Sequence, residues 1–274
     1  MSRISTRFAS LSKDGSGAYI PYVCAGDPDS GFTVELIERL CASGADIVEL
    51  GIPFSDPLAD GPVIQAAMKR SLEGGYRVRQ TFDIVSQLRA RGVEQPIVLM
   101  TYVNPVLRMG EDKFCGAASR AGADGILPVD LPPEESKPLE RQCMKNGLDL
   151  IRLVAPSTSD HRMEEVISRS SGFVYAVSVS GVTGARNRLP ESAVELLRRV
   201  APRSRLPVAL GFGISKPEHV REAIAAGAAG VVEGSALVSL YANVLNDRSK
   251  GIRLVTEHAS EMKRAAVPGK DAGH

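Results

Sequence analysis

Two acidic residues close together in the sequence could carry out proton transfer. Glu49 lies inside the short apolar run 47–50, a pattern that indicates a buried parallel strand. An uncompensated buried charge is costly, so a carboxylate there needs a partner or a chemical role. Asp60 follows on a loop that holds three prolines, which stiffen the chain and fix where the side chain points. We interpret the two as a candidate acid/base pair; alternatively, Glu49 pairs with a basic group and Asp60 caps a turn.

A second group of residues has the composition of a phosphate site. Three glycine-rich turns, 180–186, 211–215 and 233–236, follow the last three predicted strands. Glycines let backbone N–H groups approach an anion, and a helix N-terminus favours negative charge. Ser235 is expected to cap a short helix and to offer its hydroxyl. The alternative is that these glycines only form tight turns.

An internal repeat indicates the elements that position these residues. Four times, a helical pattern ends in a glycine and is followed at once by an apolar run, at Gly44, Gly122, Gly147 and Gly227. Glycine at this position is typical of a left-handed helix end, so the repeat predicts alternating helices and parallel strands. The predicted strands are 19–24, 46–50, 97–102, 125–129, 149–153, 173–179, 207–211 and 229–233.

Eight such units predict an α/β fold, a single-domain (β/α)8 TIM barrel over residues 1–266. An extra N-terminal helix is expected at 3–12, and additional helices after strands two and eight. Further helices are expected at about 30–42, 62–73 and 78–91, and one starts near Pro138. The tail 267–274 is expected to be disordered. Active sites of this fold lie at the C-terminal ends of the strands, where Glu49 is placed.

Composition excludes several other classes of function. The chain has 274 residues, 43% hydrophobic and 24% charged, with a net charge of +1. This balance does not favour binding to nucleic acid or to an anionic membrane. No apolar run is long enough for a membrane span, and no signal peptide or nucleotide-binding glycine motif is present. Four widely spaced cysteines predict free thiols in a cytoplasmic protein.

The basic residues narrow the chemistry further. No lysine lies inside a predicted strand, which disfavours a Schiff-base aldolase. The four histidines do not have metal-ligand spacing, so no metal site is expected. Carboxylate acid/base chemistry on a small phosphorylated molecule remains. An apolar pocket could be lined by residues at strand ends, although these could equally fill the barrel; they are Tyr22, Met100, Tyr102, Leu127, Tyr175 and Phe212.

Seven segments, in their order and spacing, resemble the α subunit of tryptophan synthase over residues 1 to about 265. They are IPYVCAGDPD, DIVELGIPFSDPLADGPVIQ, LMTYVNPVLRMG, DLPPEES, VYAVSVSGVTGAR, LGFGIS and VEGSA. The resemblance implies retro-aldol cleavage of indole-3-glycerol phosphate to indole and glyceraldehyde 3-phosphate. By the same resemblance, Glu49 is the general acid/base, Asp60 accepts a hydrogen bond from the indole N–H, and Tyr175 lies beside the bond that breaks.

The resemblance also assigns the binding residues. The phosphate site would be formed by Gly184, Gly213, Gly234 and Ser235. The indole pocket would be formed by Tyr22, Met100, Leu127, Phe212 and Thr183. Tyr22 stands where the family often has phenylalanine, and positions 24–25 and 127–129 also depart from its usual residues. These departures bear on which ring substituents the pocket tolerates and not on the reaction.

The family's partner is a β subunit that carries pyridoxal phosphate (PLP) in an αββα complex. This chain would therefore need no cofactor of its own. The matching contact segments are Pro53–Asp60, Asn104–Val106 and Gly181–Leu189.

Two other interpretations remain open. One is a different phosphate-binding barrel, such as a sugar-phosphate isomerase or indole-glycerol-phosphate synthase, although the synthase would be expected to carry lysines at its strand ends. The other is a subunit that mainly binds and activates a partner. The presence of both Glu49 and Asp60 speaks against lost catalysis.

Overall fold

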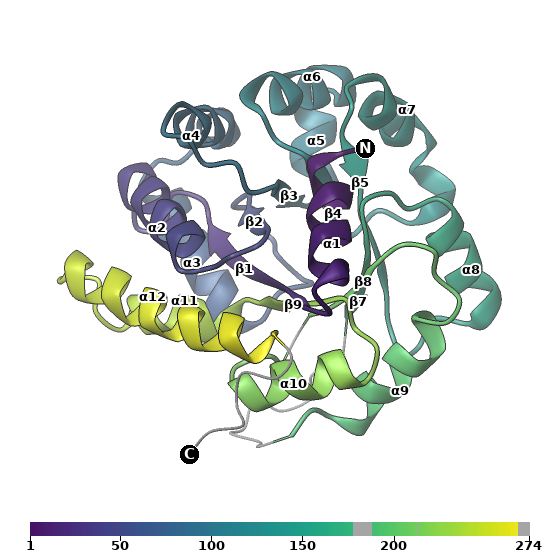
Figure 1. Cartoon of the computed structure of the whole chain (residues 1–274). Coiled ribbons are helices and arrows are strands. Elements are labelled where there is room, and N and C mark those ends of the chain that lie inside the picture. The colour runs from purple at the N-terminus through teal and green to yellow at the C-terminus, as the bar shows by residue number, and fades with distance from the viewer. Residues whose placement is uncertain (178–187, 212, 268–274) are drawn as a thin grey trace, which may run out of the picture.

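The computed structural model describes residues 1–177, 188–211 and 213–267. All strands in this part of the chain are parallel and form one sheet that curls into a barrel surrounded by helices (Figure 1). The strands are β1 (Ala18–Cys24), β2 (Val48–Gly51), β3 (Ile97–Thr101), β4 (Gly125–Pro128), β5 (Asp149–Leu150), β6 (Arg152–Val154), β7 (Val174–Val177), β8 (Val208–Gly211) and β9 (Gly230–Glu233). Their order is β5-β4-β3-β2-β1-β9-β8-β7-β6, which confirms the predicted TIM barrel.

The barrel closes through one short stretch of chain. The predicted strand 149–153 is divided, because β5 pairs with β4 whereas β6 pairs with β7. Between them, the Ile151 N–H still donates to the Ile126 carbonyl at 2.9 Å. The two edges of the sheet are therefore consecutive in sequence. The sequence predicted a single fifth strand. The segment is instead divided at Ile151, where its neighbour changes from β4 to β7.

Helices cover the outside of the barrel, and those predicted at 3–12, 30–42, 62–73 and 78–91 and from near Pro138 are all present. They are α1 (Arg3–Lys13), α2 (Ser30–Ala42), α3 (Pro62–Glu73), α4 (Val78–Ala90), α5 (Val103–Met109), α6 (Glu111–Ala121), α7 (Lys137–Lys145), α8 (Asp160–Ser168), α9 (Glu191–Val200), α10 (Pro217–Ala225), α11 (Ser235–Ala242) and α12 (Arg248–Ala265), with a 3-10 turn η1 (Pro133–Glu135). Pro138 lies in the first turn of α7 as expected. The helix pairs α3–α4 and α11–α12 are the predicted additions after the second and last barrel strands.

The glycines of the internal repeat adopt the expected backbone conformation. Gly44, Gly122, Gly147 and Gly227 have φ values of 103°, 97°, 67° and 101°. A side chain is strained at such angles, which explains the glycine at each of these helix ends.

The aspartates of the repeat hold α1 across the N-terminal end of the barrel (Figure 1). Asp46 accepts from Arg7 at 2.5 Å and from Lys263 at 2.8 Å. Asp124 accepts in the same way from Arg3, at 3.0 Å. Both carboxylates also accept backbone N–H groups of neighbouring strands. Because the buried charges are paired and hydrogen-bonded, these aspartates have a structural role at the end of the barrel opposite Glu49.

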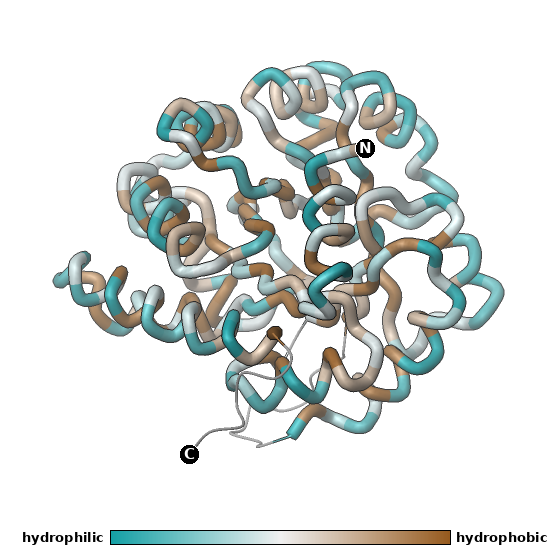
Figure 2. The backbone as a smooth tube through the Cα atoms, viewed as in Figure 1, coloured by the Kyte–Doolittle hydropathy of each residue, from teal (hydrophilic) through white to brown (hydrophobic). Residues whose placement is uncertain are grey.

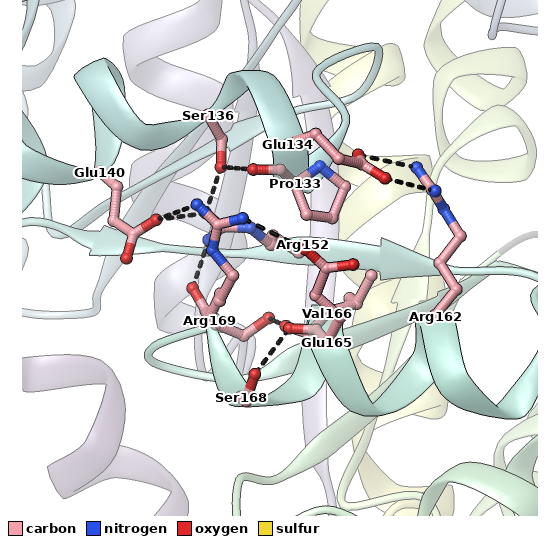
Figure 3. Close-up of polar contacts among 11 residues, drawn as sticks. Pro133, Glu134, Ser136, Glu140, Arg152, Arg162, Glu165, Val166, Ser168 and Arg169 are labelled. Atoms are coloured by element: carbon pink, nitrogen blue, oxygen red, sulfur yellow. Dashed lines mark hydrogen bonds and ion pairs between the residues drawn. The ribbon is translucent and has the colours of Figure 1, made fainter.

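A buried arginine fixes the divided strand to its covering helices (Figure 3). The Arg152 side chain, on β6, is 4% exposed and donates to Ser136 at 2.7 Å, to Glu140 at 3.1 Å and to the Arg169 carbonyl. Arg169 also donates to Glu140, at 3.1 Å. One carboxylate thus holds arginines from β6 and from the end of α8, which joins α7 and α8 to the barrel wall.

Apolar residues concentrate on the strands and recur along the helices around them (Figure 2), and their side chains form one buried core. The strands β1, β2, β3, β4, β8 and β9 are buried along their whole length, as expected for a sheet covered on both faces.

In the described part of the chain, no helix is long and apolar enough to cross a membrane. Of the predicted tail, only Val267 is described, so the expectation for 268–274 lies outside the described residues.

Candidate active site

Glu49 is a buried carboxyl group whose partners are incomplete. It lies on β2, opposite Tyr22 of β1 and Val98 of β3, and is 2% exposed. Among the described residues, no group hydrogen-bonds to its Oε2 atom. Burial and the charge of Asp60 together raise the pKa of Glu49 to about 8. The carboxyl group is therefore mostly protonated at neutral pH and is ready to donate a proton.

Asp60 is held next to Glu49 by a tyrosine from the neighbouring strand end. The Tyr102 hydroxyl donates to Asp60 Oδ2 at 2.7 Å and accepts from the Ala59 N–H at 3.0 Å. The Tyr102 ring packs against Phe54 with centroids 5.0 Å apart. Burial raises the pKa of Asp60, and the hydrogen bond from Tyr102 opposes this rise. Tyr102 therefore contacts the loop near its start, at Phe54, and near its end, at residues 59–60, and this holds the Asp60 carboxylate in place.

Sequence analysis treated Tyr102 only as a candidate pocket residue and missed its bonds to the loop. The available signal was a tyrosine immediately after the end of a strand adjacent to the strand of Glu49. No sequence pattern gives the distance between that hydroxyl and residues 59–60, because the contact joins two loops that are more than forty residues apart.

Tyr22 and Tyr175 are packed in the same manner on different sides of the barrel. A Cβ atom placed on Gly51 would lie 2.2 Å from the Tyr22 hydroxyl, and one on Gly211 would lie 2.2 Å from the Tyr175 hydroxyl. Each ring therefore lies over a glycine at the end of an adjacent strand, and no other residue would leave room for it. Burial, followed by the charges of Glu49 and Asp60, raises the pKa of Tyr175 well above its usual value. One site therefore contains both tyrosines together with the carboxyl groups of Glu49 and Asp60.

Met100 and Leu127 line the same wall of the barrel. Met100 pairs with Gly51 on one side and with Leu127 on the other. Because Gly51 is two residues beyond Glu49, all of these positions face the barrel interior. Met100 is 9% exposed and Leu127 is 1% exposed. Their burial fits both interpretations, a pocket wall and barrel filling.

The described part of the predicted phosphate site lies at the ends of two adjacent strands. Gly213 follows β8 with φ of 80°, and Gly234 precedes α11 directly after β9, which pairs with β8. Ser235 is the first residue of α11, and the capping position belongs to Gly234. The expectation that Ser235 caps this helix was therefore wrong. Its consequence is that, among the described residues, no side chain caps the first N–H groups of α11 by a hydrogen bond.

Three predicted site residues cannot be placed. Thr183, Gly184 and Phe212 lie outside the described residues. The site as described is thus formed by β1, β2 and β7 around Glu49, the loop that carries Asp60, and the turns after β8 and β9.

The structure also has a cavity of about 290 Å³ that does not include any candidate residue. It is lined by the turn after β4, by β6 and by α8, and among its residues are Asp130, Arg152, Thr158 and Arg162. Its two arginines are already engaged, Arg162 with Glu134 at 2.6 Å and Arg152 as described above (Figure 3). We therefore place the chemistry at Glu49 and not in this cavity.

The raised pKa of Glu49 leads to a pH-dependent stability. The folded protein binds this proton up to about pH 8, whereas an unfolded chain releases it near 4.5. The stabilisation is therefore complete below pH 4.5 and is lost as the pH rises through 8. Each pKa unit corresponds to about 1.4 kcal/mol. Between pH 5 and pH 9, the unfolding free energy of Glu49→Gln should rise relative to that of the unmodified protein by on the order of 4 kcal/mol.

Urea unfolding of both proteins at pH 5, 7 and 9 measures this difference. The other titrating groups are shared, so their contributions cancel in the comparison. A difference that does not change with pH would show that the Glu49 pKa is close to its ordinary value.

Comparison with known proteins agrees with this geometry. The family model of the tryptophan synthase alpha chain matches residues 8–267. The tryptophan synthase alpha chain of Gluconobacter oxydans is 47% identical over 267 residues, which cover 97% of this chain and 98% of the relative.

Solved structures of tryptophan synthase α chains are also similar to this chain. Tryptophan synthase subunit alpha from Legionella pneumophila has a TM-score of 0.89 at 36% identity, with 97% of this chain and 98% of that chain covered. A chain from Pyrococcus furiosus, solved to explain mutual activation of the tryptophan synthase a2b2 complex, has a TM-score of 0.83 at 41% identity and covers 91% of this chain and 98% of its own. The fold, the site and these relatives together show that the chain belongs to the tryptophan synthase α-chain family.

Proposed function

We propose that the chain cleaves indole-3-glycerol phosphate to indole and glyceraldehyde 3-phosphate by carboxylate acid/base catalysis. The observation that carries the proposal is the buried, incompletely bonded carboxyl group of Glu49, with a pKa of about 8, beside Asp60. A group with this pKa can give a proton and take one back near neutral pH.

The reaction needs both actions from one residue. Protonated Glu49 gives its proton to C3 of the indole ring, which makes the ring an electron-accepting cation. The resulting carboxylate then takes the proton of the hydroxyl on the adjacent side-chain carbon. The bond between this carbon and C3 breaks, its electron pair returns to the ring, and the oxygen becomes the aldehyde of the product. The protonated ring is itself the electron acceptor, so the step requires neither a Schiff base nor a metal.

Asp60 stabilises the positive ring. In the part of the chain that the structure describes, Tyr102 bonds only to Oδ2 of this carboxylate, which leaves Oδ1 to accept the indole N–H. As the ring gains positive charge, its N–H becomes a stronger donor, so this hydrogen bond strengthens in the transition state. Tyr175 lies within electrostatic reach of both carboxylates and borders the bond that breaks.

The phosphate is bound by the turns after β8 and β9 and the N-terminus of α11, with Gly184 from the loop that follows β7. A Cβ atom added at Gly234 would make ordinary van der Waals contacts, with Tyr22 Cβ at 3.8 Å and Ile64 Cδ1 at 4.0 Å. The first turn of α11 contains no acidic residue. Backbone N–H groups at a helix N-terminus whose first turn holds no acidic side chain favour an anion.

Gly234→Asp is expected to raise the KM for indole-3-glycerol phosphate at least tenfold while the protein stays folded. The Cβ of the new side chain makes no clash and its carboxylate can cap α11, but its negative charge repels the phosphate. Gly234→Asn is the matched control, because it has the same size without the charge. Steady-state kinetics and thermal unfolding of both variants test this. Equal KM values for the two variants would argue against phosphate binding at this turn.

A β subunit is the proposed partner, and PLP would belong to that subunit. The Pyrococcus relative is described as part of an a2b2 complex. Two of the few strongly exposed large apolar side chains among the described residues are Leu58, 92% exposed, and Leu107, 56% exposed. They lie in and beside the contact segments 53–60 and 104–106 that sequence analysis proposed, and exposed apolar groups favour an interface.

The burial of residues 104–106 refines this surface. Asn104 is exposed, but Val106 is fully buried. The apolar contact on α5 is therefore assigned to Leu107 in place of Val106. The third segment, 181–189, is described only at Arg188 and Leu189.

Other assignments are less favoured. Eight of the nine lysines lie on helices or, for Lys216, at a helix cap, and Lys270 lies outside the described residues. This arrangement does not support indole-glycerol-phosphate synthase chemistry. The four cysteines are free thiols, which supports a reducing, cytoplasmic location.

The experiment that tests the proposal measures indole released from indole-3-glycerol phosphate, without added metal. The protein is assayed alone and with a tryptophan synthase β subunit. Slow release alone and much faster release with the β subunit are expected. No release in either assay from a folded protein would overturn the proposal and favour another phosphate-binding barrel activity.

A further inference from the structure

The Tyr22 hydroxyl is a buried polar group that lacks a hydrogen-bond partner. Tyr22 is 3% exposed, and no group in the described part of the chain satisfies its oxygen. The side chain that interacts with it is Cys24: burial raises the pKa of this thiol, and the hydrogen-bonding effect of Tyr22 opposes the rise, although the geometry of the pair does not make a hydrogen bond. A thiol is a poor partner for a hydroxyl, so the hydroxyl remains unsatisfied.

This hydroxyl faces the candidate active site. Tyr22 and Glu49 are paired across β1 and β2, so their side chains lie on the same face of the sheet. The Tyr22 ring extends over Gly51, with its oxygen where a Cβ of that residue would be. The charges of Asp60 and Glu49 both act on it. Tyr22 OH and Glu49 Oε2 are thus two unsatisfied oxygens in one site.

Such a hydroxyl has an energetic cost that phenylalanine would avoid. The ring could pack over Gly51 without the oxygen, and an unsatisfied buried polar group destabilises the free protein. A bound molecule that offers a hydrogen bond would remove the cost, and would bind better than a molecule that lacks one. In the proposed reaction the two carboxylates act on the indole ring, so a hydroxyl close to both of them lies next to the bound ring.

We propose that the Tyr22 hydroxyl makes the site selective for aromatic rings that carry a hydroxyl group on the benzo ring, an inference that rests on the proposed function. The hydroxyl of the ring and that of Tyr22 would form one hydrogen bond, with either as the donor. Unsubstituted indole remains a substrate but leaves Tyr22 unsatisfied.

The test uses the reaction in the synthetic direction, in which C3 of the ring bonds to the aldehyde carbon of glyceraldehyde 3-phosphate. Protonated Glu49 gives its proton to the aldehyde oxygen as the bond forms, and the resulting carboxylate then takes the proton from C3, which restores the aromatic ring. The kcat/KM of indole is compared with that of hydroxyindoles substituted at each benzo-ring carbon. For at least one isomer, Tyr22→Phe should lower the ratio of hydroxyindole to indole by about tenfold, which corresponds to about 1.4 kcal/mol. An unchanged ratio for every isomer would overturn the inference.

Tyr76→Phe is the matched control, because the Tyr76 hydroxyl is buried and bonded to Thr81 at 2.8 Å. It should lower stability and leave the substrate ratio unchanged. Tyr22→Phe should leave the thermal midpoint unchanged or raise it, since no hydrogen bond is lost. A fall as large as that of Tyr76→Phe would show that Tyr22 is already satisfied and would refute the inference.

Failure of the proposed function and failure of the Tyr22 role give different results. If the unmodified protein condenses neither indole nor any hydroxyindole, the proposed function is overturned and this inference falls with it. Normal condensation with an unchanged ratio in Tyr22→Phe overturns the inference alone.

Discussion

Glu49→Gln is expected to lower the rate of indole-3-glycerol phosphate cleavage by about 10³-fold or more. The amide fills the same space but can neither give a proton to indole C3 nor take one from the hydroxyl. The proposed reaction uses both transfers, so little turnover should remain. Initial rates of indole release, measured with the isolated chain and again with a β subunit, test this expectation.

Binding must be separated from catalysis in this variant. Glutamine carries no charge, as the protonated Glu49 side chain carries none at neutral pH, so affinity for a non-cleavable indolylalkyl phosphate should change little. Calorimetry of that ligand measures this directly. Substantial residual cleavage in Glu49→Gln would remove Glu49 from the mechanism.

Glu233→Gln is a matched control at another buried strand end. Glu233 accepts from Tyr19 at 2.7 Å and lies 2.7 Å from His258 Nε2. It pairs with Pro21 of β1 and therefore faces away from Tyr22 and Glu49. Its replacement should reduce stability, because partnered groups lose bonds, and should leave kcat largely intact. Loss of activity in Glu233→Gln equal to that in Glu49→Gln would mean that both losses come from damage to the barrel.

Asp60→Asn is expected to slow cleavage by about 10² to 10³-fold. The positive charge on the indole ring exists mainly in the transition state, so the loss of the Asp60 charge should appear in kcat more than in KM. The asparagine can still accept from Tyr102, which keeps the loop in place. Steady-state kinetics over a range of substrate concentrations separate the two parameters.

Asp56→Asn serves as the control for Asp60→Asn on the same loop. Asp56 is exposed and its carboxylate bonds only to Ser55 among the described residues. In assays of the isolated chain, this substitution should leave kcat unchanged. An unchanged kcat in Asp60→Asn would refute a role for Asp60 in stabilising the transition state.

The fold followed from local sequence signals. The repeated glycine at helix ends, the apolar runs after it and the spacing of these units predicted the barrel, because each signal reflects the backbone preference of a few adjacent residues. The division of the fifth strand at Ile151 was not predictable. It depends on which neighbour each half meets when the barrel closes, and that neighbour is distant in sequence.

The sequence also determined which residue types were available for the chemistry. It placed Glu49 in a buried strand and Asp60 on a proline-rich loop after it. The predicted strands held no lysine for a Schiff base, and the histidines did not have the spacing of metal ligands. The type of residue and strand alone does not separate Glu49 from Glu233, since both are glutamates in apolar strands; the loop that carries Asp60 and the family resemblance pointed to Glu49.

Tertiary structure decided between these two glutamates. Glu233 lies on the outward face and is bonded on both oxygens, whereas Glu49 lies on the inward face with one oxygen unsatisfied. It also decided that Tyr102 holds Asp60, that Gly234 takes the capping position expected of Ser235, and that the Tyr22 hydroxyl has no hydrogen-bond partner among the described residues. The physical reason is the same in each case: a pKa, a cap or an unsatisfied hydroxyl depends on groups brought together from distant segments, and local sequence preferences do not encode those distances.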